Sequence, residues 1–100
     1  MTPEEALALL LDSRKKIDEI DVKLVELLNE RTRLVEHIGG AKAALDLPVK
    51  ESNREDDVFR NVIAHNAGPI PADALRRVFE RIIEEMRELQ GMRRESSGKP

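Results

Sequence analysis

Residues 2–45 carry one repeating pattern that constrains this chain more than any other feature. Side chains on one helical face follow each other at alternating intervals of four and three residues, without a slip. No proline interrupts the stretch between Pro3 and Pro48. The positions are Leu10, Arg14, Ile17, Asp21, Leu24, Leu28, Arg31, Val35, Ile38, Lys42 and Leu45. The pattern predicts one long amphipathic helix packed against partner helices.

A helix of this length does not fit a small monomeric globule. At 1.5 Å per residue it extends roughly 60 Å. A compact domain of 100 residues has a radius of gyration of only about 13 Å. The far end of the helix would therefore expose apolar side chains in a monomer. We expect two chains to pair through their long helices and form a homodimer.

The sequence marks where the first helix begins and ends. Thr2 and Glu5 have capping-box spacing at its start, and Pro48 cannot continue it. Inside the helix, Gly39 and Gly40 predict the close approach of another backbone or of a ligand. A kink or an early end of the helix at these glycines is the alternative.

Two further helices follow in the prediction, so that the fold class is all-α with a long, a short and a medium helix. Ser52 and Glu55 repeat the capping-box spacing at the start of the short helix. The medium helix begins near residues 71–73, after a turn rich in glycine and proline, and its apolar face ends at Gln90. We expect residues 1–90 to form the domain and residues 91–100 to be a polar tail or a linker.

Composition excludes several classes of function. Net charge is −3 and aromatic residues make up 2% of the chain, which argues against nucleic acid and anionic membranes as partners. Without cysteine there is no disulfide, thiolate metal site or thiol nucleophile. We expect no metal and no cofactor. The lack of a long apolar run and of a basic, apolar leader predicts a soluble cytoplasmic protein.

Three cations interrupt the apolar face of the long helix: Arg14, Arg31 and Lys42. A buried cation without a counter-charge is costly, so their positions predict an anionic ligand. Arg14 lies about 25 Å along the helix from Arg31, and could share a ligand with it only from the second chain of an antiparallel dimer. Alternatively, these side chains fix the helix register or extend to the surface, and Asp21 pairs with an arginine across the dimer.

Polar side chains elsewhere extend this candidate site. Glu51, Arg54 and Glu55 surround the predicted start of the short helix, and Gln90 ends the apolar face of the last one. Cations, carboxylates and one amide suit a small, hydroxylated polyanion. Catalysis at such a site would depend on positioning and on stabilising developing negative charge.

These residues stand in segments that resemble the all-helical class of chorismate mutases over about residues 7–90. The segments are KIDEID preceded by Arg14, LLNERTRLVEHIGGAK, PVKESNRE and FERIIEEMRELQ. The resemblance implies an intertwined homodimer with two equivalent sites, each using residues from both chains. It also implies conversion of chorismate to prephenate without a cofactor or a covalent intermediate.

The resemblance implies a role for each cation and for Gln90. Arg14 from the partner chain, Arg31 and Arg54 would bind substrate carboxylates. Lys42 and Gln90 would donate hydrogen bonds to the ether oxygen from two sides as its bond to carbon breaks. Lys42, Gln90 and Arg31 are therefore the predicted catalytic residues.

Two carboxylates complete the implied site, and two positions depart from the family pattern. Glu55 would hold the ring hydroxyl of chorismate, with help from Glu51, which stands where the family often has aspartate.

Met86 stands where some relatives have a small polar residue that contacts a substrate carboxylate, and we do not expect methionine to keep that contact. Lys50 stands where arginine is common.

The segment HNAGPIPADALRRVFERI particularly resembles mutase domains fused ahead of DAHP synthase, which makes that enzyme a predicted fused or associated partner. Three other functions stay open. One is the related isochorismate pyruvate lyase. Another is a domain that binds chorismate or prephenate to regulate a DAHP synthase. The last is a structural helical dimer without a ligand.

Overall fold

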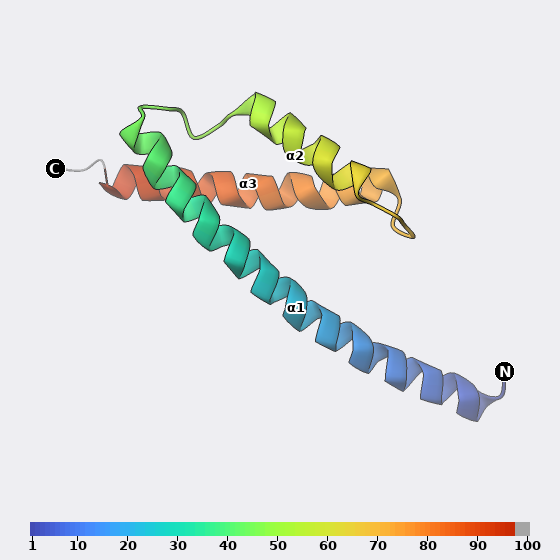
Figure 1. Ribbon diagram of the computed structural model, residues 1–100. Coiled ribbons are helices and arrows are strands. Elements are labelled where there is room, and N and C mark those ends of the chain that lie inside the picture. The colour runs from blue at the N-terminus through green and yellow to red at the C-terminus, as the bar shows by residue number, and fades with distance from the viewer. Residues whose placement is uncertain (98–100) are drawn as a thin grey trace. The chain divides into compact units, whose positions relative to one another are not determined.

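The computed structural model describes residues 1–97 and consists of three helices, α1 Pro3–Ala44, α2 Ser52–Ala64 and α3 Ala72–Ser97 (Figure 1). No strand occurs among these residues. The predicted all-α class and the order long, short, medium are therefore confirmed. The chain divides into two compact units, Met1–Arg33 and Leu34–Pro100.

The start of α1 follows the predicted cap. The backbone N–H of Glu5 donates to the Thr2 hydroxyl at 3.1 Å, which satisfies one of the unpaired N–H groups of the first turn. Glu4 and Glu5 also place negative charge at the positive end of the helix dipole. The helix continues through Gly39 and Gly40, so the alternative of an early end at these glycines is wrong.

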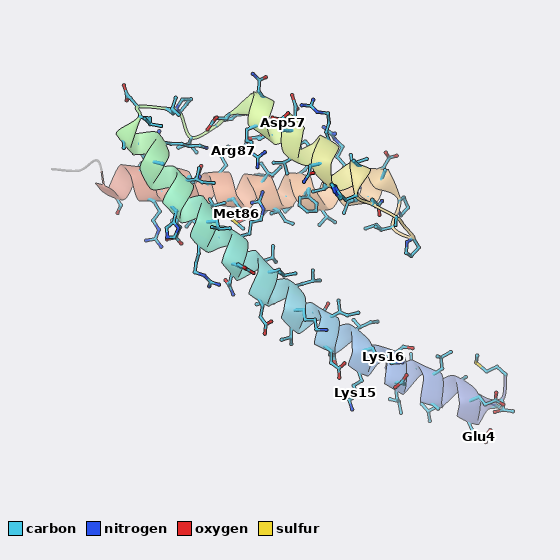
Figure 2. All side chains as sticks on the ribbon, in the orientation of Figure 1. Glu4, Lys15, Lys16, Asp57, Met86 and Arg87 are labelled. Atoms are coloured by element: carbon cyan, nitrogen blue, oxygen red, sulfur yellow. The ribbon has the colours of Figure 1, made fainter. Side chains whose placement is uncertain are left out.

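The N-terminal unit exposes nearly all of its apolar side chains. No residue of α1 is buried, and Figure 2 shows side chains projecting along its length. Ile17, Leu24 and Leu27 keep 53%, 51% and 60% of their surface accessible. Exposed apolar area of this extent is typical of a surface that binds another protein.

A left-handed residue ends α1 before Pro48 is reached. Asp46 has φ 59°. The N–H of Leu47 donates to the carbonyl of Lys42 at 2.8 Å, and the N–H of Asp46 donates to the carbonyl of Ala43 at 3.2 Å. These two bonds form a Schellman motif, which satisfies carbonyls of the last turn.

The predicted cap of α2 is wrong by one residue. The N-cap is Glu51, with φ −125° and ψ 93°, and its side chain makes no capping hydrogen bond. Ser52 is instead the first helical residue. The carboxylates of Glu51 and Glu55 each contact a cation elsewhere, so neither is available to the helix terminus.

Contacts between α2 and α3 form the core of the C-terminal unit. Phe59 of α2 and Ile83 of α3 are each only 8% exposed. The guanidinium of Arg76 lies over the Phe59 ring, 4.2 Å from its centroid. The turn between the helices is closed by Asn66, whose side chain accepts from the N–H of Gly68 and donates to the carbonyl of Ile70.

The last helix is longer than predicted. Its apolar face ends at Gln90, but the helix continues to Ser97. Residues 91–97 are therefore helical rather than a tail, because charged residues of good helix propensity extend a helix without needing an apolar face. Residues 98–100 of the predicted tail lie outside the described residues.

The left-handed conformation of Asp46 makes the end of α1 sensitive to side-chain shape. Asp46→Val should lower the free energy of unfolding by about 1–2 kcal/mol, since a β-branched residue is strained at positive φ. Asp46→Gly should be at least as stable as the wild type, because glycine adopts this conformation freely. Urea unfolding followed by circular dichroism measures both changes. As a control, Lys50→Val in the same loop should change the free energy of unfolding by less than about 0.5 kcal/mol. An Asp46→Val variant as stable as wild type would contradict the left-handed conformation of Asp46.

Candidate functional site

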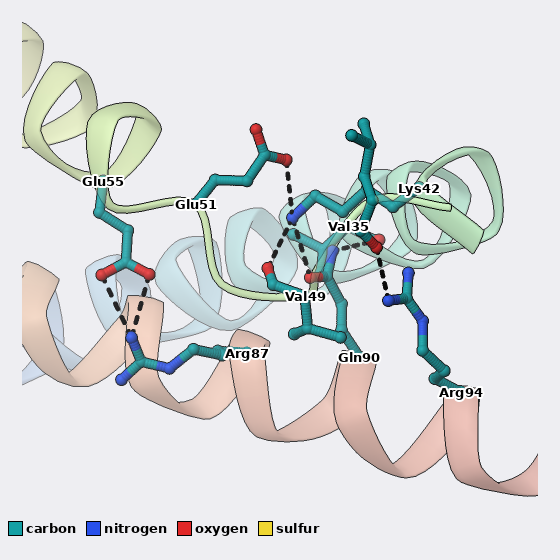
Figure 3. Close-up of polar contacts among 9 residues, drawn as sticks. Val35, Lys42, Val49, Glu51, Glu55, Arg87, Gln90 and Arg94 are labelled. Carbon is teal, nitrogen blue, oxygen red and sulfur yellow. Dashed lines mark hydrogen bonds and ion pairs between the residues drawn. The ribbon is translucent and has the colours of Figure 1, made fainter. Parts of the chain in front are cut away.

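The ammonium group of Lys42 is the centre of a polar network within the C-terminal unit (Figure 3). Its Nζ donates to the carbonyl of Val49 at 2.8 Å and to Gln90 Oε1 at 3.3 Å. It also forms an ion pair with Glu51 Oε1 at 3.3 Å. The Lys42 side chain is only 13% exposed. An ammonium group has three protons to donate, and three acceptors surround this one.

Gln90 is held at both ends of its amide. Its oxygen accepts from Lys42, and its Nε2 donates to the backbone carbonyl of Val35 at 3.0 Å. Gln90 is only 8% exposed, which makes it a buried polar residue. A buried amide with both ends bonded is fixed in orientation, so Gln90 presents the same groups to any ligand that enters.

The two glycines of α1 differ in what lies beside them. A Cβ on Gly39 would lie 3.5 Å from Gln90 Cγ, whereas a Cβ on Gly40 would meet nothing within 4 Å. The group that lies close to Gly39 is thus the Gln90 side chain, and not another backbone or a ligand as predicted. Glycine at position 39 leaves room for that amide next to the last turns of α1.

A second ion pair of this polar network joins α2 to α3. Arg87 Nη1 lies 3.2 Å from Glu55 Oε1 and 3.0 Å from Oε2. The Arg87 side chain is 32% exposed and the Glu55 side chain 22%. Figure 3 shows the guanidinium facing both carboxylate oxygens. The sequence reasoning placed Glu55 in the site but did not predict Arg87.

The segment after Gln90 holds the connection between α1 and α2. Arg94 Nη1 donates to the carbonyl of Leu47 at 2.6 Å. This connection also supplies the Val49 carbonyl and the Glu51 carboxylate to Lys42. The helical extension of α3 thus fixes the loop that surrounds the ammonium group, a role that a polar tail would not have.

The contacts follow one register between two antiparallel segments. Along α2 and its N-cap, Glu51, Glu55 and Phe59 are separated by four residues each. On α3, Gln90 is linked to Glu51 through Lys42, and Arg87 pairs with Glu55 (Figures 1 and 3). The buried residue Ile83 lies one helical turn before Arg87. The same helical faces of α2 and α3 therefore contribute apolar side chains to the core and, one or two turns away, polar side chains to the site.

The charges of this network cancel. Lys42 and Arg87 are the cations of its two ion pairs, and Glu51 and Glu55 are the carboxylates. The network offers fixed donors and acceptors but no excess positive charge. A ligand with two negative charges would need further cations.

The remaining predicted residues are Arg14, Arg31, Arg54 and Met86. Arg14 is exposed and Arg31 is half-buried, and both belong to the unit Met1–Arg33. Arg54 is exposed on α2, and Met86 is half-buried on α3. In residues 1–97 no group of three or more His, Asp or Glu side chains is placed to hold a metal ion.

Arg87 and Arg94 are the functional candidates that the sequence reasoning missed. Arg87 precedes Gln90 by three residues and Arg94 follows it by four, so all three share one face of α3. That spacing was the available clue. Arginine on a charged helix is so common that the clue was not specific.

Comparison with known proteins assigns the family. Residues 13–91 match the family described as chorismate mutase type II. This chain belongs to that family. The sequence-based prediction of the family is confirmed.

Solved and curated chorismate mutases are similar to this chain. The structure of form II of the Thermus thermophilus chorismate mutase has a TM-score of 0.80 and 32% identity, and the match covers 82% of this chain and 93% of that one. The chorismate mutase of Methanocaldococcus jannaschii is 36% identical over 53 residues, which is 53% of this chain and 54% of that protein.

Several relatives are longer proteins with a second activity. The bifunctional chorismate mutase/prephenate dehydratase of Aquifex aeolicus is 36% identical over 78 residues, which is 74% of this chain. The match spans 22% of that protein's length. The second activity in its name is prephenate dehydratase, so a DAHP synthase partner is not confirmed. Within residues 1–97, no helix has the length and apolar character needed to cross a membrane.

The contrast between the two glycines gives a matched test of the site. Gly39→Leu should lower mutase activity at least about tenfold, because its side chain would occupy the space of the Gln90 amide and displace a hydrogen-bonded group. Gly40→Leu should keep the activity within about twofold, because the neighbouring space is open. Prephenate formation measures both. Equal losses in the two variants would contradict the role of Gly39.

Proposed function

We propose that this chorismate mutase rearranges its substrate beside Lys42 and Gln90. The reaction is intramolecular: the carbon–oxygen bond of the enolpyruvyl ether breaks, a carbon–carbon bond forms, and no atom enters or leaves. Negative charge grows on the ether oxygen as its bond to carbon breaks. A fixed donor near that oxygen binds the transition state more tightly than the ground state and so raises the rate.

The observation that carries the proposal is the hydrogen bond between two almost buried side chains from different helices, the Lys42 ammonium as donor and the Gln90 amide oxygen as acceptor. Lys42 Nζ and Gln90 Oε1 are 3.3 Å apart, so the ammonium and the amide can face one small group. In the arrangement described here all three Lys42 partners are protein atoms. Substrate therefore replaces one of them. Glu51, 40% exposed, is the partner most easily displaced.

The carboxylates of Glu51 and Glu55 are proposed to bind the hydroxyl group of the substrate. Glu55 is proposed to accept a hydrogen bond from the ring hydroxyl, with Glu51 as a second acceptor once it has left Lys42. Both side chains lie at the N-terminus of α2. An ionised carboxylate accepts hydrogen bonds only, which suits a hydroxyl group and repels the carboxylates of the substrate.

The substrate's two carboxylates need cations that the Lys42 network does not supply, since its charges cancel. Arg14, Arg31 and Arg54 are proposed to fill this need. Arg14 is proposed to come from a second copy of the chain. The predicted catalytic set thus stays Lys42, Gln90 and Arg31.

The second copy is proposed on the exposed apolar face of α1. That helix has no buried residue, and its apolar positions alternate at intervals of four and three residues, the spacing of helices that pack against each other. The proposed homodimer would cover these side chains and bring Arg14 to its partner's site. One interaction would then explain both the apolar surface and an arginine on the same face.

The fused or associated partner stays a matter of prediction. The sequence resemblance favours DAHP synthase, whereas the named second activity of the bifunctional relatives is prephenate dehydratase. Prephenate is the product proposed for this chain, so a dehydratase would act on it directly. The nearest alternative activity, isochorismate pyruvate lyase, is separated by assaying prephenate against pyruvate as the product.

Lys42→Ala should abolish nearly all mutase activity, with a loss of at least about a hundredfold, because it removes a charged donor from the transition state. The variant should keep the helical circular dichroism of the wild type. Continuous measurement of chorismate consumption tests the change. Lys50→Ala, close in sequence on the same loop, serves as the control for folding and should stay active. A fully active Lys42→Ala variant would remove the proposed site.

Mixing two inactive variants tests the shared site. Arg14→Ala and Lys42→Ala chains, refolded together, should recover roughly a quarter of wild-type activity, because half of the dimers are mixed and one of their two sites is intact. Each variant refolded alone should stay inactive. No recovery, although mass analysis shows mixed dimers, would place Arg14 outside the partner's site.

A further inference from the structure

We infer that Arg87 is a positioning residue, which holds the Glu55 carboxylate in the orientation that accepts the substrate's hydroxyl. This inference rests on the proposed function, because it assumes that Glu55 contacts substrate. It adds a residue that the sequence comparison with the family did not assign. It also explains why an arginine precedes Gln90 on the face of α3 that forms the site.

The contact is directed at both carboxylate oxygens rather than at one. Arg87 Nη1 lies 3.2 Å and 3.0 Å from Glu55 Oε1 and Oε2. Both side chains are half-buried, which protects the pair from screening by solvent more than an exposed pair. Both bonds come from the single nitrogen Nη1, and because they hold both oxygens, they restrict the rotation of the glutamate carboxylate.

The position of the pair connects the core to the site. Glu55 lies one helical turn before the buried Phe59, and Arg87 lies one turn after the buried Ile83. On its other side, Arg87 is three residues from Gln90, which bonds Lys42. The guanidinium therefore stands on a rigid part of α3, and Figure 2 shows Arg87 there directed toward α2.

The pair leaves Glu55 able to bind a ligand. A carboxylate has about four lone-pair directions, and the guanidinium nitrogen uses those on one side. The other side can accept a hydroxyl. The positive charge of Arg87 also offsets a carboxylate that would otherwise repel an anionic substrate.

Kinetics separate positioning from a merely structural tie between α2 and α3. A hydroxyl contact exists in both the bound substrate and the transition state, so its loss raises KM more than it lowers kcat. We expect Arg87→Met to raise KM for chorismate about tenfold and to lower kcat less than about threefold. The KM of Arg87→Lys should lie between those of wild type and Arg87→Met, because lysine keeps the positive charge but carries it on a more flexible side chain than the planar guanidinium.

A double-mutant cycle with Glu55→Gln gives the decisive comparison. If Arg87 acts through Glu55, adding Arg87→Met to the Glu55→Gln protein should raise KM no further. If Arg87 only ties the helices together, the two increases should multiply. Arg81→Met is the matched control, because Arg81 pairs with Glu84 and Glu85 of its own helix, and it should leave KM unchanged.

Three results would overturn the inference: an unchanged KM in Arg87→Met, multiplicative effects in the cycle, or an equal change in Arg81→Met. If Arg87→Met loses its helical circular dichroism, Arg87→Lys decides, and a KM equal to wild type then counts against positioning. A wild-type chain that forms no prephenate would overturn the proposed function, and this inference with it. Active wild type with unchanged variants overturns the inference alone.

Discussion

The rest of the site depends on one nearly buried ammonium group. Lys42 is tolerated away from water because a loop carbonyl, an amide and a carboxylate surround it. Each acceptor comes from a different element of the fold. The carbonyl comes from the loop after α1, the amide lies beside Gly39, and the carboxylate belongs to the N-cap residue of α2, which makes no side-chain capping bond. The unusual local features of this unit are thus consequences of placing one positive charge.

The helices could be predicted from the regular spacing of apolar residues, but the side-chain contacts between the helices could not. The spacing of apolar residues and the Thr2 cap predicted the bounds of α1 to within about one residue. Lys42, Glu51 and Gln90 were predicted to share one site. The predicted Ser52 cap was wrong, and Arg87 binds the Glu55 carboxylate that a capping box would use. Arg87 and Arg94 were missed because their partners depend on the register of α3 against α2 and the loop, which no local pattern contains. The contributions proposed for Arg14, Arg31 and Arg54 stay predictions.

Exposed apolar surface and charge balance lead to the same proposal from independent directions. The first concerns α1, where large side chains remain accessible over most of the helix. The second concerns the site in the C-terminal unit, where Lys42 and Arg87 pair with Glu51 and Glu55. A second copy would relieve the exposed surface and deliver a missing cation. In this family member, assembly and substrate binding would then be one event, and dilution of the protein would weaken both.

The Schellman motif at the end of α1 joins helix termination to the site through a single residue. The backbone carbonyl of Lys42 accepts a hydrogen bond from the N–H of Leu47, and its ammonium group donates hydrogen bonds to Val49 and Gln90 in the site. Fraying of this last turn would therefore release the ammonium group without unfolding the core around Phe59 and Ile83. Inactivation on heating would then begin as a local event at a helix end, so that activity is lost at a lower temperature than helical structure.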